Sequence, residues 1–315
     1  MSNVLKWHGG KHYLAPWIIS HFPPHLHYVE PFFGGGAVLF ARDPGRNWLA
    51  GSPDCVTNGN GSPKSYHSGV SEVVNDVHGE LTNFWSVLQN EKHFARLQRR
   101  LEATPFSKVE WDASWNVRGD EHEVERAARF FIRYRQSRQA IGKDFATLSR
   151  ARTRRNMNEQ ASAWLRSIEG LPEAHQRLRG VVIMCDDAVN VIRTQDGPYT
   201  LFYCDPPYVQ QSRTTPECYE YEMGEEQHRR LLKALCGVEG KVVLSGYHNP
   251  VYDELLGDWR VVEREIDNKA GSGAIKEKRI EVLWMNFEAP ANASPEKKTR
   301  TKTLRTLAAM DDAAE

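Results

Sequence analysis

The sequence predicts an α/β fold whose sheet is interrupted by a helical insertion. Short apolar runs typical of strands alternate with segments of helical periodicity near both ends of the chain. Between them, residues 104–178 show no strand pattern. The chain has 315 residues, of which 40% are hydrophobic and 26% charged, so it can bury the core of one large domain.

The elements before the insertion can be placed in order. A short strand at residues 28–31 leads into a glycine turn and the first turns of a helix at 37–42. Residues 43–69 are rich in Gly, Ser, Asn and Pro and are expected to form a mobile loop. A second strand is predicted at 72–75, and a single amphipathic helix at 81–101.

The insertion and the later elements follow. Helices are predicted at residues 127–134 and 158–168, joined by a basic, irregular connection. The later elements are strands at 181–184 and 200–203, a helix at 224–235, a strand at 242–244, and a closing strand pair at 259–265 and 279–287. The tail after residue 289 lacks an apolar face and is expected to be disordered.

Cysteine content and hydropathy indicate the compartment. The five cysteines are an odd number without a CxxC spacing, which argues against a disulfide framework or a zinc site. No apolar run approaches the roughly 18 residues that span a bilayer, and no apolar segment follows the N-terminus. We therefore expect a cytoplasmic protein that does not bind membranes and needs no metal.

Basic residues are concentrated in the insertion although the formal net charge is zero. Residues 126–180 contain thirteen Lys or Arg and four Asp or Glu, so this window carries +9 and the other 260 residues carry −9. Such segregation favours a polyanionic partner.

The sharpest motif is Asp205-Pro206-Pro207-Tyr208, directly after an apolar strand. Ligands of open α/β sheets bind at the carboxyl ends of strands. The prolines donate no backbone N–H, so their carbonyls can accept from a ligand, and the Tyr208 ring offers a face on which a base can stack. A carboxylate and a carbonyl that accept the two N–H bonds of an exocyclic amine would favour its attack on a methyl sulfonium.

Two further segments carry weaker signals. Glu30-Pro31-Phe32-Phe33-Gly34-Gly35-Gly36 joins a strand to a helix through a turn that a nucleotide could approach, although it is neither GxGxxG nor a P-loop. Asp76 ends the next strand, where its carboxylate suits a ribose diol or, equally, a helix N-cap. The N-terminal KWHGGK contains Trp7 and Lys11. Taken in isolation, Trp7 is interpreted as a core residue and Lys11 as a surface charge.

Together these segments resemble the DNA adenine methylase (Dam-like) family, the alpha group of N6-adenine DNA methyltransferases. The resemblance spans roughly residues 3–288, keeps the order of the family's motifs, and includes a late strand at 279–286. It implies an S-adenosylmethionine-dependent methyltransferase (Rossmann-like) sheet formed by residues 1–82 and 179–289. Residues 83–178 would be a helical target-recognition insertion, and 290–315 the tail.

The resemblance also implies roles for individual residues. Catalysis is assigned to Asp205, Pro206, Pro207 and Tyr208. Contacts with the cofactor, S-adenosyl-L-methionine, are assigned to Trp7, Lys11, Glu30, Pro31, Phe32, Gly34, Gly36, Asp76, Asp186 and Asp205. Asp187 could take the place of Asp186. The 43–69 loop departs from the family pattern and leaves the alignment of Asp76 open. A second departure is the pair Gly35 and Gly36, where one glycine would do.

The implied partner is duplex DNA, bound by a monomer or by two copies on one site. Phosphate or guanine contacts are expected from Arg133, Arg135, Arg138, Arg150, Arg152, Arg154 and Arg155. Because adenine N6 is buried in the duplex, the target base would have to flip out. The alternatives are N4-cytosine methylation, an RNA substrate, and a non-catalytic DNA-binding module on a methyltransferase fold; the motif order and Asp205 favour adenine.

Overall fold

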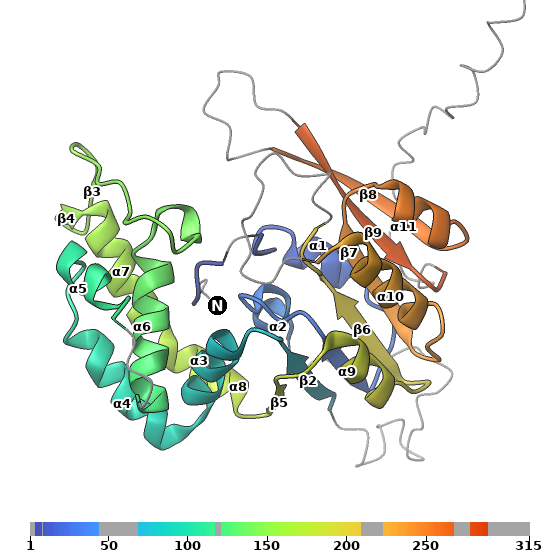
Figure 1. Cartoon of the computed structure of the whole chain (residues 1–315), viewed down its shortest axis with the longest axis horizontal. Coiled ribbons are helices and arrows are strands. Elements are labelled where there is room, and N and C mark those ends of the chain that lie inside the picture. The colour runs from blue at the N-terminus through green and yellow to red at the C-terminus, as the bar shows by residue number, and fades with distance from the viewer. Residues whose placement is uncertain are drawn as a thin grey trace, which may run out of the picture.

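The computed structural model describes residues 4–7, 9–43, 69–116, 121–208, 223–267 and 278–288. At its centre is a seven-stranded sheet with the order β5-β2-β1-β6-β7-β9-β8 (Figure 1). The strands are β1 (His27–Glu30), β2 (Ser71–Asn75), β5 (Val181–Met184), β6 (Thr200–Cys204), β7 (Lys241–Gly246), β8 (Arg260–Asp267) and β9 (Lys278–Met285). The first five are parallel, and β9 runs antiparallel to both β7 and β8.

Both faces of the sheet are buried at its central strands β6 and β7. On β6, Leu201 and Tyr203 belong to one hydrophobic cluster, while Phe202 and Cys204 belong to the other. The first cluster includes residues of α1 (Ala15–Ser20), α2 (Ala37–Ala41) and α3 (Gly79–Gln89), and the second includes residues of α9 (Ala188–Thr194), α10 (Glu225–Leu235) and α11 (Pro250–Leu255). Burial on both faces explains why these strands are continuous apolar runs.

The insertion between β2 and β5 is mainly helical and lies to one side of the sheet (Figure 1). Besides α3 it contains α4 (Glu91–Glu102), α5 (Lys108–Ala113), α6 (Glu123–Arg135), α7 (Glu159–Glu169) and α8 (Leu171–Leu178). The predicted Rossmann-like α/β fold with a helical insertion is confirmed. The division predicted between residues 82 and 83 falls inside α3, whose Phe84 stacks on Phe131 of α6 and whose Trp85 donates to the Gly34 carbonyl.

Two local predictions were wrong. The single helix predicted at 81–101 is two helices, because Asn90 leaves the helical backbone (ψ 123°) and its side chain accepts from the His93 N–H to begin α4. Residues 104–178 do contain strands, in a hairpin of β3 (Thr153–Arg154) and β4 (Met157–Asn158). Its turn residues, Arg155 and Asn156, have φ of 55° and 60°, as a two-residue hairpin turn requires.

The other strands predicted from the sequence are present, including the closing pair β8 and β9. Most of the predicted 43–69 loop (residues 44–68) and the predicted tail (290–315) lie outside the described residues. Within the described part of the chain, no helix is long and apolar enough to cross a membrane.

Candidate functional site

A cavity of about 730 Å³ opens where the strand order of the sheet reverses. From β1 the sheet continues to β2 and β5 on one side, and through β6 to β7 on the other. Ligands of open α/β sheets bind at such a point. The predicted residues that line the cavity are Trp7, Lys11, Glu30, Pro31, Phe32, Gly34, Gly36, Asp76, Arg133, Asp205, Pro206, Pro207 and Tyr208.

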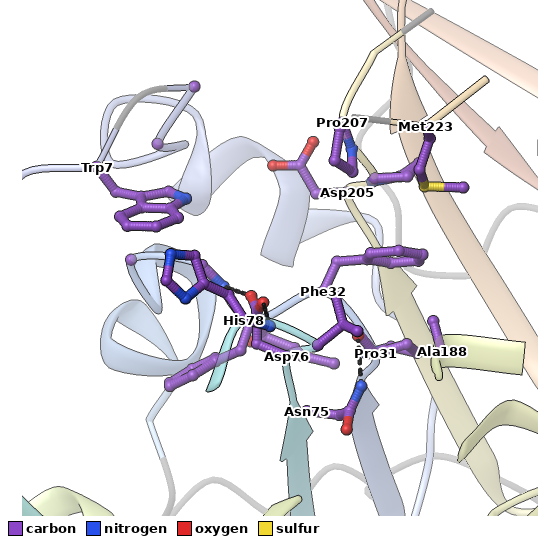
Figure 2. Close-up of a pocket in the computed structure, with 18 of the residues that line it drawn as sticks. Trp7, Pro31, Phe32, Asn75, Asp76, His78, Ala188, Asp205, Pro207 and Met223 are labelled. Atoms are coloured by element: carbon purple, nitrogen blue, oxygen red, sulfur yellow. Dashed lines mark hydrogen bonds between the residues drawn. The ribbon is translucent and has the colours of Figure 1, made fainter. Parts of the chain in front are cut away.

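The two sides of the cavity differ in chemistry. Figure 2 shows Phe32, Ala188 and Met223 on one side, with Trp7, Asp76 and His78 across from them. The Asp205 carboxylate points into the space between the two sides (Figure 2). An apolar wall facing a few polar groups is typical of small-molecule sites.

The glycine turn is shaped by Trp7. Gly34 and Gly36 have positive φ (49° and 68°), which favours glycine. A Cβ on Gly35 would lie 2.8 Å from the Trp7 Cβ, and one on Gly36 would lie 2.8 Å from the Phe33 ring. The consecutive glycines are therefore required by packing of the protein against itself. The Trp7 ring also lies 5.1 Å from that of Tyr134, so it connects the turn to α6.

Asp76 fastens the glycine turn to the end of β2. Its carboxylate accepts the backbone N–H of Gly34 at 2.9 Å and that of His78 at 3.0 Å. The N-cap of α3 is His78, whose Nδ1 accepts from the Leu81 N–H, so the alternative that Asp76 caps this helix is wrong. Burial raises the pKa of Asp76, although the two backbone hydrogen bonds oppose the shift.

Asn75, which the sequence analysis did not single out, links three strand ends. Its Nδ2 donates to the carbonyls of Pro31 and Asp186, both at 3.0 Å, and its Oδ1 accepts the Asp186 N–H at 2.9 Å (Figure 2 shows the bond to Pro31). The side chain is 1% exposed. A polar residue at the end of an apolar strand was the available signal, and only the sheet order reveals its partners.

The acidic pair after β5 is divided between two tasks. Asp187, not Asp186, lines the cavity. The Asp187 side chain caps α9 by accepting from two backbone N–H groups and also forms a two-pronged ion pair with Arg230, with both distances 3.0 Å. The Asp186 backbone is held by Asn75, and its side chain accepts from the Asp187 N–H at 2.6 Å.

A buried cluster of charges surrounds the Asp205–Tyr208 motif. Lys11 lies 3.2 Å from Asp205 Oδ1 and 2.8 Å from Glu281 Oε1, and it donates to the Tyr208 hydroxyl. Burial raises the pKa of Asp205 to about 7, although Lys11 opposes the shift. Burial lowers the pKa of Lys11, but the carboxylates of Asp205 and Glu281 outweigh it and raise that pKa above the ordinary lysine value. Lys11 is therefore a charged partner of Asp205.

Glu30 occupies the floor of the cavity rather than its open wall. It is 2% exposed and accepts the Tyr28 hydroxyl at 2.6 Å. Burial raises the pKa of Glu30 to about 8, although the Tyr28 hydrogen bond opposes the shift. Glu30 is the last residue of β1 and directly precedes the glycine turn.

The seven predicted arginines fall into two groups. Arg133 and Arg135 on α6 are partly buried: Arg133 Nε donates to the Ser114 carbonyl at 3.0 Å, and burial lowers the pKa of Arg135 to about 10. Five are exposed, namely Arg138, Arg150, Arg152, Arg154 and Arg155. Five insertion residues that line the cavity were not predicted, namely Trp115, Tyr134, Ile141, Gly142 and Lys143.

The exposed arginines near the hairpin are not equivalent. Arg155 forms a two-pronged ion pair with Glu169 at 2.6 and 3.0 Å, and Arg152 lies 3.8 Å from Glu159. Neither Arg150 nor Arg154 forms an ion pair with any residue that the structure describes. Figure 1 places this hairpin at the end of the insertion, away from the sheet.

Comparison with known proteins agrees with this geometry. Residues 7–50 and 65–268 match the model of the family described as D12 class N6 adenine-specific DNA methyltransferase. The chain is also similar to the Type II methyltransferase M1.LlaDCHI of Lactococcus lactis subsp. cremoris, with 25% identity over 303 residues. That similarity covers 90% of this chain and 94% of the relative.

Proposed function

Since this chain belongs to the D12 class of N6 adenine-specific DNA methyltransferases, we propose that its cavity binds S-adenosylmethionine beside a flipped adenine. The observation that carries the proposal is the meeting of Asp205 and Tyr208 with the glycine turn and Asp76 around one cavity. The adenine specificity of the family agrees with the substrate that the motif order predicted.

The residues present fit the methyl donor. The cavity of about 730 Å³ lies within the range of roughly 300–1,000 Å³ typical of ligand sites. The Asp76 carboxylate suits ribose hydroxyls, and the apolar wall of Phe32, Ala188 and Met223 suits an adenine ring. Acidic groups at this end of the sheet also suit a cationic ligand. When bound, the cofactor supplies an electrophilic methyl group on a sulfonium sulfur.

Asp205 and the Pro206 carbonyl are the proposed acceptors for the adenine amino group. Lys11 contacts Asp205 Oδ1, and the other carboxylate oxygen has no donor among the described residues. An N6 amine that donates to Asp205 and to a carbonyl has its lone pair freed from conjugation with the ring. The Tyr208 ring is supported at 4.5 Å by Tyr247 and would stack on the base.

The proposal includes base flipping, because adenine N6 is paired inside a duplex and could not reach Asp205, whose side chain is 19% exposed. The insertion lies beside the cavity and contributes Arg133 to it. The exposed arginines of the hairpin would contact phosphates and so position the duplex. Similarity to a Type II methyltransferase supports a role in restriction–modification. We propose that the enzyme acts in the cytoplasm, as a monomer or as two copies on one site.

The test is Asp205→Ala, with the exposed Asp258→Ala as its matched control. Each purified variant is incubated with tritium-labelled S-adenosylmethionine and unmethylated duplex DNA, and the labelled nucleoside is identified after digestion. Wild type and Asp258→Ala should label N6-methyl-deoxyadenosine, whereas Asp205→Ala should lose transfer while keeping its fold. A folded Asp205→Ala protein with full activity would refute the assigned mechanism. If the wild-type protein does not bind S-adenosylmethionine, that molecule is not its methyl donor.

A further inference from the structure

Glu281 is a buried carboxylate at the base of the Asp205–Tyr208 motif that has no role in the assignments above. It is 1% exposed, and its Oε1 accepts from three donors. These are the Tyr208 hydroxyl at 2.7 Å, the Ser245 hydroxyl at 2.6 Å and the Lys11 ammonium at 2.8 Å. One oxygen of Glu281 therefore joins segments that are far apart in the sequence.

The antiparallel direction of β9 brings Glu281 to the site. The five parallel strands present their carboxyl ends at the cavity, but β9 presents its beginning there. Gly246, the last residue of β7, pairs with Val282, so Glu281 lies at the edge where β7 ends. An acidic residue early in a reversed strand thus reaches the same edge as Asp205, which follows β6.

In this cluster the ammonium group of Lys11 lies between two carboxylates. Lys11 bridges the carboxylates of Asp205 and Glu281, and it is 6% exposed. A buried ammonium paired with Asp205 alone would be held by the one carboxylate that must also accept from the substrate. With Glu281 present, the ammonium has a second anionic partner, and Lys11 has a fixed position between the two. Removing a partner from a buried charge is costly, which makes such a pair a strong positional constraint.

Tyr208 is held by the same residue. Its hydroxyl donates to Glu281 and accepts from Lys11, and its ring packs edge-on against Tyr247. These contacts restrain the Tyr208 side chain at its hydroxyl and through the packing of its ring with Tyr247. The Tyr208 ring, on which the base is proposed to stack, is thereby held in place.

We propose that Glu281 is a positioning residue for methyl transfer, which holds Lys11 and Tyr208 so that Asp205 and the Tyr208 ring meet the adenine correctly. The inference rests on the proposed roles of Asp205 and Tyr208. Glu281 itself does not touch the substrate. It acts through the two side chains that it contacts.

Glu281 also influences the charge state of Asp205. Burial raises the pKa of Asp205 most, Lys11 lowers it, and the negative charge of Glu281 raises it. Other titratable groups close to this cluster are Tyr203, Cys204, Tyr208, Tyr247 and Tyr252. Burial raises the pKa of Tyr203, Cys204 and Tyr252, so these three groups stay neutral near pH 7. Removal of the Glu281 charge should therefore let Asp205 stay ionised at lower pH.

The experiment compares Glu281→Gln with Glu72→Gln in the full-length protein. Glu72 is also buried, 6% exposed, and pairs with Arg42 and Arg177 away from the cavity. Melting temperature, cofactor affinity, and the pH profile of kcat on unmethylated DNA are measured for each. Glu281→Gln should lose roughly 10- to 100-fold in kcat, the range found when groups that orient metal ligands are removed, with a smaller change in cofactor affinity. It should also shift the acid limb of the profile to lower pH.

Glu72→Gln should lower the melting temperature without moving the acid limb of the pH profile of kcat. A Glu281→Gln enzyme with the wild-type kcat and pH profile would overturn the proposal. So would a variant whose only change is a lower melting temperature, as for Glu72→Gln. If Glu281→Gln does not fold, Ser245→Ala removes one donor to Glu281; a reduced kcat at unchanged cofactor affinity supports the proposal, and an unchanged kcat contradicts it.

A double-mutant cycle with Tyr208→Phe separates direct from indirect action. Tyr208→Phe keeps the ring but removes its hydrogen bonds to Glu281 and Lys11. If Glu281 acts through Tyr208, adding Glu281→Gln to Tyr208→Phe should cost less than it costs alone; strictly additive losses would contradict that route. Full activity of Asp205→Ala would instead refute the underlying mechanism, which distinguishes the two failures.

Discussion

Replacement of Gly35 by alanine tests the packing that shapes the glycine turn. Gly35 has an ordinary φ, so the added methyl group introduces no backbone strain and acts only through contact. That Cβ would lie 2.8 Å from the Trp7 Cβ, whereas carbon atoms pack best at about 3.5–4.0 Å. The turn and Trp7 must therefore separate by roughly 0.7 Å or more. Because a Cβ is fixed to the backbone, rotation of the Trp7 ring cannot relieve the contact.

We expect Gly35→Ala to lower the free energy of unfolding by about 1–3 kcal/mol, the usual cost of overpacking. The same separation displaces Trp7 and Gly34, which form part of the cavity wall. If 1 kcal/mol of strain is carried into the bound state, the Kd for S-adenosylmethionine rises about fivefold. Urea unfolding measures the first quantity, and titration calorimetry measures the second.

Gly79→Ala is the matched control. A Cβ on Gly79 meets no atom within 4 Å, and this residue begins α3 with an ordinary φ. Its stability should be unchanged or up to about 1 kcal/mol higher, because alanine restricts the unfolded chain. If Gly35→Ala matches the wild type in both stability and Kd, Trp7 does not pack on the turn as described, and the reasoning fails.

Two further predictions concern the strand ends and the insertion. Asn75→Ala leaves the buried partners at Pro31 and Asp186 without hydrogen bonds, so the free energy of unfolding should fall by about 1–3 kcal/mol in chemical denaturation; an unchanged value would mean that water replaces the amide. Arg154→Ala should weaken DNA binding and reduce the slope of log K against log salt concentration by about 0.9, as expected for one lost phosphate contact. Titrations at several salt concentrations measure this slope, and an unaltered slope would exclude such a contact.

The sequence was sufficient for the parts of the fold that depend on local pattern. Apolar runs on strands buried on both faces are continuous, which made β6 and β7 visible. The single helix predicted at 81–101 is interrupted at Asn90, whose side chain caps a second helix. The hydrophobic spacing continues across this break, so it could not reveal it. The hairpin of β3 and β4 escaped notice because its strands have two residues each and no alternating pattern.

The residues of the site also divide into those that local pattern reveals and those that it does not. Trp7, Lys11, Asp76 and Asp205 could be selected from the sequence, because each lies in a motif or at the end of a predicted strand. Their partners could not be selected. Asp76 binds the backbone of the glycine turn, and Lys11 binds Asp205 itself, which are contacts between segments separated by many residues.

What the sequence by itself determined is the set of local elements, the order of the motifs, and through them the class of reaction. What the tertiary structure decided is which side chains share a charge or a hydrogen bond. Glu281 shows the difference, because it is one acidic residue in an apolar strand until the direction of β9 is known. The strand order and the antiparallel pairing with β7 place its carboxylate beside Lys11 and Tyr208. Long-range pairing fixes such contacts, and no local pattern encodes it.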